Sequence, residues 1–324
     1  MSNRLWLNRT RKLAAAGDAH AQEHLARFLA LRPNASDYRK ECVALLTSAS
    51  EKGNAAALYA LGNWHHYGIG VKKNPKAAYR YCLAAAKKGS VEAQYSAGVY
   101  LELGEITRKN LTGAANWYKS AALAGDIDAQ RELGRCYLAG IGVPKNKQRA
   151  FAWYLKAAKA GDADSQFEVS NHYSLGKPTN RRKAVIWAKK AADQGNSEAQ
   201  LYLGYAYFYG EGIKQNKARG ISLYSKAAKQ GESPAMFNVG LCYWQGNGKR
   251  LDYNRAVRWF RRAAALGHQR SMRKLAEAHR HGKGVRKDIR RAIAWYRLLL
   301  VKGDPDARRE ISSLKKSSRR GAPN

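Results

Sequence analysis

The sequence contains no CxxC pair, and its cysteines, Cys42, Cys82, Cys136 and Cys242, lie far apart. This spacing excludes a cysteine zinc site and a dense disulfide framework. No run of about 18 apolar residues occurs, so we expect no membrane span. Residues 1–17 are basic but lack the apolar stretch of a signal peptide, and we therefore expect a cytoplasmic protein.

Acidic residues are few as well. The chain of 324 residues has 24 Asp and Glu against 59 Lys and Arg, which gives a formal net charge of +35. Hydrophobic residues make up 45%, which is too many for a disordered basic tail and enough to bury a sizeable core. Runs of β-branched residues are missing, and this argues against a sheet. The composition therefore indicates a folded, basic, helical protein.

Glycine marks an internal repeat. One register recurs every 36 residues, with a single step of 34: Gly17, Gly53, Gly89, Gly125, Gly161, Gly195, Gly231, Gly267, Gly303. A second register follows nine residues later: Gly62, Gly98, Gly134, Ser170, Gly204, Gly240, Ala276. A fixed period between about 20 and 50 residues indicates stacked supersecondary units.

Each unit has the signals of two helices. The first opens at a capping residue after the phase glycine and stops at a turn that usually carries a GxG pair. The second opens at a regular cap: Asn74, Asn110, Asn146, Asn180, Asn216, Asp252, Asp288. It ends at the next phase glycine, which adopts the left-handed conformation without strain. We predict an all-α fold, a right-handed α-solenoid of helix-turn-helix repeats of about 36 residues.

The pattern A-x-x-x-LG-x-x-Y-x-x-G-x-GV followed by A-x-x-WY-x-KAA-x-x-G resembles the Sel-one-like repeats, a tetratricopeptide-like family. The segment AQRELGRCYLAGIGVPKNKQRAFAWYLKAAKAG, residues 129–161, is a nearly complete match. The resemblance implies a non-enzymatic adaptor, and family members are frequent in bacteria. We predict these segments: a basic extension 1–16, a divergent capping repeat 17–52, seven repeats over 53–303 (53–88, 89–124, 125–160, 161–194, 195–230, 231–266, 267–302), a closing helix 304–316 and a disordered tail 317–324.

Recurrence separates packing residues from candidate functional ones. Tryptophans recur eight residues before the phase glycine, as at Trp117 and Trp153, and a position filled in every unit indicates packing between helices. His65 and His279 occupy the position that tyrosine fills in other units, and neither has the sequence context of a metal site. We find no nucleophile or acid–base constellation. We therefore predict no catalytic, cofactor-binding or metal-binding residue, and no enzyme activity.

Partner contacts are expected from positions that packing does not fix. In helix-pair solenoids the first helices line the concave face, and three positions around the second-register glycine lie near one side of that helix. Aromatic residues and arginine dominate binding hot spots, and partly buried packing is the alternative role for such side chains. The predicted partner-binding residues on the concave face are Arg135, Tyr202, Tyr205, Phe208, Asn238, Trp244 and Lys274.

Basic residues recur at the turn between the two helices of a unit. Stacking should align these turns into a basic edge, with a solubilising surface as the alternative role. Its predicted members are Lys72, Lys73, Lys145, Lys147, Arg181, Arg182, Arg286, Lys287, Arg290 and Arg291. Charge also rises along the chain: residues 17–52 are neutral, whereas residues 231–324 carry 23 Lys and Arg against 7 Asp and Glu.

Two functions fit these features. The first is a protein-interaction scaffold that holds a partner, expected to be acidic, on the concave face while the basic edge steers the encounter. The second is non-specific nucleic-acid binding through the basic edge, which a calculated pI near 10.2 favours. Contact with an anionic membrane surface is a further candidate. The aromatic residues fall mainly in packing positions, and this favours the first function.

Overall fold

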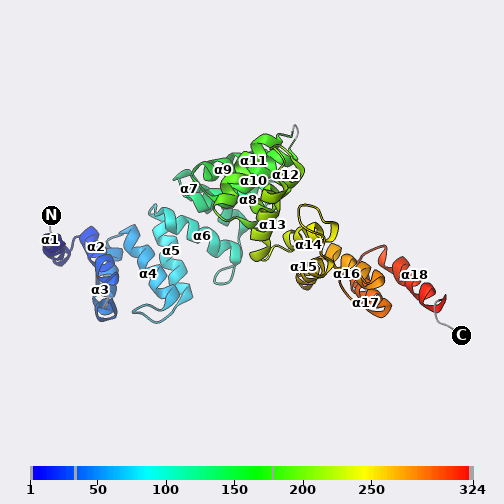
Figure 1. The fold of residues 1–324 in the computed structure, drawn as a ribbon. Coiled ribbons are helices and arrows are strands. Elements are labelled where there is room, and N and C mark those ends of the chain that lie inside the picture. Colours follow the sequence, from blue (N-terminus) through cyan, green and yellow to red (C-terminus); the bar gives the residue numbers. More distant parts are fainter. Residues whose placement is uncertain (1–2, 33–34, 177–178, 321–324) are drawn as a thin grey trace. The chain divides into compact units, whose positions relative to one another are not determined.

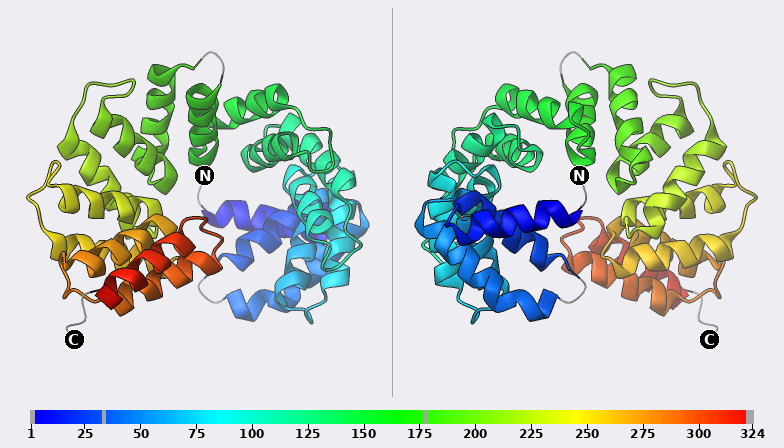
Figure 2. Two further views of the ribbon diagram at one scale, coloured as in Figure 1. Left: turned by 90° about the vertical axis from the view of Figure 1, so that its right-hand side faces the viewer. Right: turned by 90° about the vertical axis from the view of Figure 1, so that its left-hand side faces the viewer.

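The computed structural model describes residues 3–32, 35–176 and 179–320, and within them every regular element is a helix. The chain divides into two compact units, Met1–Ala160 and Gly161–Asn324, which are described separately. In each unit, every helix packs on the next one along the chain (Figures 1 and 2). The predicted all-α solenoid is therefore confirmed.

The first unit holds nine α-helices and one 3-10 turn among its described residues. In chain order they are α1 (Asn3–Ala15), α2 (Ala19–Ala30), η1 (Ala35–Tyr38), α3 (Arg39–Glu51), α4 (Ala55–Tyr67), α5 (Pro75–Lys87), α6 (Val91–Leu103), α7 (Leu111–Leu123), α8 (Ile127–Ala139) and α9 (Lys147–Lys159).

The second unit continues the same alternation. Its helices are α10 (Ala163–Leu175), α11 (Arg181–Asp193), α12 (Ser197–Tyr209), α13 (Lys217–Lys229), α14 (Ser233–Gln245), α15 (Tyr253–Ala265), α16 (Gln269–His281), α17 (Ile289–Val301) and α18 (Ala307–Arg320). In both units the even-numbered helices from α4 to α16 are the first helices of their repeats, and the odd-numbered helices from α5 to α17 are the second helices.

Capping side chains fix where the helices begin. Asn146, for example, accepts a hydrogen bond from the backbone N–H of Arg149 at 2.9 Å, and Asp252 accepts one from that of Arg255 at 2.8 Å. All seven predicted second-helix caps make this contact with the third residue of the helix. Such a bond satisfies an amide that has no partner within the helix. Gly140, with a φ of 80°, ends α8 in the left-handed conformation.

The second-register glycines let the two helices of a repeat approach closely. A Cβ atom on Gly98 would lie 2.5 Å from Cε1 of Tyr118, and one on Gly240 would lie 2.5 Å from Cε1 of Phe260. Both rings are buried, so a ring of the second helix occupies the space that a side chain on the first helix would need. This contact explains why the sequence keeps small residues at the register.

The ends of the chain carry additional helices. Residues 3–15 form α1, and its Ala14 joins the core of α2 and α3. At the other end, the carboxylate of Asp304 binds Arg273 at 2.6 Å and accepts a hydrogen bond from the backbone N–H of Asp306 at 3.0 Å. Helix α18 begins at Ala307 and continues to Arg320, so it extends into the segment 317–324 for which we predicted disorder. Residues 321–324 lie outside the described part of the chain.

Candidate functional site

Three predicted contact residues meet in one groove of the second unit. Tyr202 and Tyr205 from α12 and Asn238 from α14 line a groove of about 590 Å³ on the side of the first helices. Phe237 of α14 and His268, which caps α16, line it as well. Phe167 of α10 lines the groove too, so it runs across the first helices of four consecutive repeats, α10 to α16.

Two predicted contact residues lie in the core instead. Phe208 is 6% exposed and packs on Tyr224, and Trp244 is 7% exposed and packs between Tyr253 and Phe260 at ring distances of 4.9 and 5.8 Å. The prediction that these two side chains form an accessible patch is wrong. Their position on the helix turns them toward the second helix of their own repeat.

An exposed tyrosine that sequence reasoning missed lies next to Tyr205. Tyr209 is 56% exposed and Tyr205 42%, and their ring centroids are 4.5 Å apart. They are four residues apart on α12, a spacing that places side chains on the same helix face. Tyr67, which is 70% exposed, holds the same position before its turn in the first unit. This recurrence is the signal that could have identified Tyr209.

The groove carries carboxylates. Burial and the nearby Glu232 and Asp164 raise the pKa of Glu198. Glu232 accepts a hydrogen bond from the Ser197 hydroxyl at 2.7 Å. Arg270 and His268 of the following repeat line the groove as well. The groove thus has mixed charge, with Glu198 of α12 and Glu232 at the start of α14 as its carboxylates.

The first helices are acidic over the middle of the chain. The carboxylates of α6, α8, α10 and α12 are Glu92, Glu102, Asp128, Glu132, Asp164, Glu168 and Glu198. The cations of these helices are Arg131 and Arg135, which both form ion pairs with those carboxylates. The second helices are the opposite: α5, α7, α9, α13, α15 and α17 contain no Asp or Glu, and α11 has Asp193 alone. The net positive charge is therefore concentrated on the second helices.

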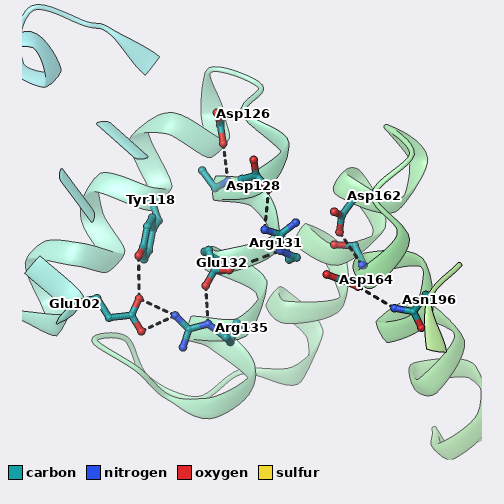
Figure 3. A network of polar contacts seen from close by, with 12 residues as sticks. Glu102, Tyr118, Asp126, Asp128, Arg131, Glu132, Arg135, Asp162, Asp164 and Asn196 are labelled. Carbon is teal, nitrogen blue, oxygen red and sulfur yellow. Dashed lines mark hydrogen bonds and ion pairs between the residues drawn. The ribbon is translucent and has the colours of Figure 1, made fainter. Parts of the chain in front are cut away.

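The predicted contact residue Arg135 is held by two carboxylates of the first unit. Its Nη2 lies 2.5 and 2.7 Å from the oxygens of Glu102, and its Nε lies 2.6 Å from Glu132 (Figure 3). The Tyr118 hydroxyl donates to Glu102 at 2.9 Å. Burial would raise the pKa of Glu102, but the bonds from Arg135 and Tyr118 outweigh it and lower that pKa. The positive charge of Arg135 is therefore paired with carboxylates of the protein itself.

Lys274 of α16 is held in a similar way. Its Nζ lies 2.7 Å from the carboxylate of Glu277 and 5.4 Å from the ring centroid of Trp244. In the second unit, Figure 3 shows a further contact between first helices, in which the side chain of Asn196 donates to Asp164 at 2.9 Å. Several side chains on this face are thus bound to one another, whereas Tyr205 and Tyr209 of α12 remain exposed.

The first unit has grooves on the same side of its repeats. One of about 360 Å³ lies between α4 and α6, and its lining includes Tyr67, Tyr100 and Leu103. Another of about 780 Å³ lies across α2, α4 and the start of α6, beside the exposed side chain of Leu31. Sequence reasoning did not predict either groove. Their presence shows that the first helices offer hollows in both units.

All residues of the predicted basic edge are exposed. Arg181 pairs with Glu211 of the following turn, Nε to Oε2 at 3.2 Å. The second glycine of a GxG turn packs on the start of the preceding second helix: a Cβ on Gly212 would lie 2.6 Å from the carbonyl oxygen of Arg181. Gly248 lies over the side chains of Lys217 and Ile221 in the same way. Consecutive turns of the second unit are therefore neighbours.

The described residues include no group of three or more His, Cys, Asp or Glu side chains that could hold a metal ion. All four cysteines are free and buried. Burial raises the pKa of Cys82 to about 12 and that of Cys136 to about 11, which opposes thiolate formation. Of the helices in the described ranges, none is both long and apolar enough to cross a membrane.

These features define a class, a helix-pair repeat protein with grooves along its first helices. A family model of the Sel1 repeat matches residues 55–90, 91–126, 127–162, 163–196, 197–232, 233–268 and 269–299. The chain therefore belongs to the Sel1 repeat family, which confirms the resemblance to the Sel-one-like repeats. This fold is a tetratricopeptide-like scaffold typical of protein–protein interaction, and it is generally non-enzymatic.

Two solved structures are similar over most of this chain. One is c5321, a protective antigen present in uropathogenic Escherichia coli strains that displays an SLR fold, with 25% identity, a TM-score of 0.72, and coverage of 96% of this chain and 75% of that one. The other is a Sel1 repeat protein from Oxalobacter formigenes, with 27% identity, a TM-score of 0.69, and coverage of 95% and 90%. Among curated proteins, none matches this chain.

Proposed function

We propose that the chain is a non-enzymatic scaffold that binds an extended segment of a protein partner along its first helices. The observation that carries this proposal is the groove of about 590 Å³ beside α12, where Tyr205 and Tyr209 present adjacent exposed rings. Tyrosine supplies large, rigid contact area, and such side chains dominate binding energy. The grooves of the first unit extend this type of surface along other repeats.

The carboxylates of the groove indicate which charge the bound segment should carry. The overall charge predicts an acidic partner, but Glu198 and Glu232 line the groove and would repel an acidic segment there. An acidic partner would instead be drawn to the second helices and the basic edge. In the groove, we propose a segment with apolar side chains and a basic side chain opposite the two carboxylates. The basic edge then acts on regions of the partner that lie outside the groove.

The test is a capture experiment followed by a binding measurement. The full chain is immobilised, exposed to nuclease-treated lysate of its source, and washed at physiological salt. Captured proteins are identified by mass spectrometry, and overlapping peptides of each stoichiometric partner are titrated by calorimetry. The proposal expects one peptide that contains apolar and basic residues to bind the isolated chain.

Paired variants locate the contact. Tyr205→Ser with Tyr209→Ser removes the exposed rings of the groove, and we expect at least about a tenfold loss of peptide affinity. Ile186→Ser with Leu266→Ser is the control, because these side chains are 57% and 58% exposed, on α11 and directly after α15 of the same unit. Equal effects of the two pairs, or no effect of either, would overturn the proposed site.

A further inference from the structure

A row of cations recurs at the third residue of the second helices in the second unit. Lys183, Arg219 and Arg255 lie over the rings of Tyr173, Tyr207 and Tyr243, with distances to the ring centroids of 5.5, 5.9 and 5.8 Å. The corresponding residue of α17 is Arg291. A cation over a tyrosine face is held in place while its charge stays available to solvent. The row therefore places one cation at the same position of each repeat, and Arg255 and Arg291 also pair with the capping carboxylates Asp252 and Asp288.

The turns add further cations beside this row. Gly212 packs on Arg181, Gly248 on Lys217, and Gly284 on the backbone of Tyr253, so each turn lies against the start of the preceding second helix. We call the resulting surface the cationic row. Its members are Arg181, Arg182, Lys183, Lys214, Lys217, Arg219, Lys249, Arg250, Arg255, Arg286, Lys287, Arg290 and Arg291. Packing between repeats thus brings together charges that are distant in the sequence.

The last two turns of the cationic row enclose a groove of about 980 Å³. Lys249, Arg250, Arg255 and Arg286 line it, against one carboxylate, Asp252. Asp252 is engaged already, because it caps α15 and pairs with Nε of Arg255 at 3.2 Å. In the part of the chain that the structure describes, Lys249, Arg250 and Arg286 have no carboxylate within ion-pair distance. The groove is therefore a hollow with unpaired positive charge.

We propose that the cationic row binds the phosphate backbone of a nucleic acid. A surface whose charges recur once per repeat matches a polymer whose charges also recur, without requiring a particular sequence in the ligand. The tyrosine rings of the row are covered by cations, so they are not available to stack on bases. The row therefore makes phosphate contacts and does not read sequence.

A membrane surface fits this row less well. Binding in the headgroup region combines basic residues with apolar side chains that enter the bilayer. In the turns 246–252 and 282–288, Leu251 is the one exposed large apolar residue.

An acidic protein would need carboxylates at intervals that match the row. Every nucleic acid, in contrast, carries negative charges at regular intervals on its phosphates. The site is separate from the groove beside α12, so it adds a second partner to the proposed scaffold.

The test measures binding of mixed-sequence RNA and duplex DNA of about 30 nucleotides, which is longer than the site size of typical strand-binding domains. Fluorescence anisotropy is recorded over a series of salt concentrations. The test variant is Lys249→Gln, Arg250→Gln, Arg286→Gln and Lys287→Gln combined. The control removes the same charge from exposed positions on the second helices of the same unit: Lys226→Gln, Lys229→Gln, Arg258→Gln and Arg261→Gln. Circular dichroism checks that both variants fold.

We expect the wild-type chain to bind both ligands at physiological salt with a steep salt dependence and no sequence preference. The test variant should lose at least about tenfold in affinity, and its salt slope on duplex DNA should fall by up to about 3.6, at about 0.9 per phosphate contact. The control variant should lose less than about threefold. Tyr205→Ser with Tyr209→Ser should leave this binding unchanged, which separates it from the proposed peptide site.

Three outcomes would overturn the proposal. Binding weaker than about 100 µM at physiological salt falls below ordinary non-specific affinity for nucleic acid. Equal losses in the test and control variants would show an effect of net charge alone. The third is binding of anionic phosphatidylserine vesicles that is tighter than nucleic-acid binding and lost in the test variant, which would assign the row to a membrane surface.

Discussion

Arg135 on α8 binds both carboxylate oxygens of Glu102, which lies on α6 in the preceding repeat, at 2.5 and 2.7 Å. The bond joins two first helices directly, and Glu132 completes it from the same helix as Arg135. Apolar contacts also join neighbouring repeats of this unit, as in the core around Ala85 and Ala97. The ion pair therefore fixes the relative position of two repeats by charge as well as by packing.

Replacing Arg135 with alanine should destabilise the protein. The substitution leaves Glu102, whose side chain is 21% exposed, with the Tyr118 hydroxyl as its remaining hydrogen-bond donor. We expect a loss of about 1–2 kcal/mol, because Arg135 is partly exposed and its charge is partly screened. Denaturant unfolding measures the change. Lys145→Ala, at an exposed position, is the control and should change little. An Arg135→Ala protein as stable as the control would contradict the role assigned to this pair.

Glu102 and Glu168 should respond to pH with opposite signs. The pKa of Glu102 is lowered from 4.5, so its ionised form stabilises the fold above that pH, and this contribution is lost as the pH falls through the folded-state pKa. Glu102→Gln should therefore destabilise at pH 7, by an amount that shrinks in acid. Burial raises the pKa of Glu168, so its ionisation disfavours the fold as the pH rises.

Glu168→Gln should consequently stabilise the protein at pH 7 and have little effect near pH 3. Melting temperatures of the wild type and both variants, recorded between about pH 3 and 8, give the two differences directly. The same sign for both substitutions at pH 7 would contradict the assigned environments.

Gly240→Ala should destabilise the second unit. The new methyl group would meet the ring of Phe260 at 2.5 Å, and overpacking of this type costs about 1–3 kcal/mol. In the double variant with Phe260→Leu, the smaller side chain relieves the contact. The double variant should therefore lose less free energy of unfolding than the sum of the losses in the two single variants. Chemical denaturation of the four proteins in this cycle is the measurement. If the stability losses of the two single variants simply add up in the double variant, Gly240 and Phe260 do not interact as proposed.

The buried cysteines should resist alkylation in the native protein. Burial raises the pKa of Cys242 to about 11 and that of Cys82 to about 12, so thiolate is scarce at pH 8 and reagents have little access. We expect iodoacetamide to modify the native thiols at least about tenfold more slowly than those of the unfolded chain. Mass spectrometry over time gives both rates. A native cysteine that reacts as fast as in guanidinium would contradict its buried position.

The local signals of the sequence predicted the repeat architecture well. Capping residues such as Asn146 and left-handed glycines such as Gly140 act within a few residues, so their spacing specifies where helices begin and end. The solenoid fold followed from that spacing, and the family from the resemblance of the repeated motif, as in residues 129–161, to the Sel-one-like repeats. The end of the last helix did not follow from local signals, since α18 continues to Arg320, beyond the closing helix expected over 304–316.

The sequence did not predict equally well which side chains of the binding surface are exposed. Tyr205, Phe208 and Tyr209 are close in sequence and similar in type, yet a rotation of about 100° per residue sends Phe208 into the core while the two tyrosines remain exposed. The sequence also does not show that Arg135 is paired with a carboxylate 33 residues away. Both facts depend on which helix packs beside which, and on how closely.

By itself, the sequence determined that this chain is a basic, all-helical repeat protein, because glycine registers and caps act locally and recur in every unit. The tertiary structure decided where its charge and its aromatic side chains are available. Packing of first against second helices buries one set of rings and exposes another. Stacking of turns on neighbouring helices gathers cations into the row from Arg181 to Arg291, whereas carboxylates collect on the first helices. The burial of rings thus depends on contacts between the two helices of one repeat, whereas the gathering of cations depends on contacts between repeats.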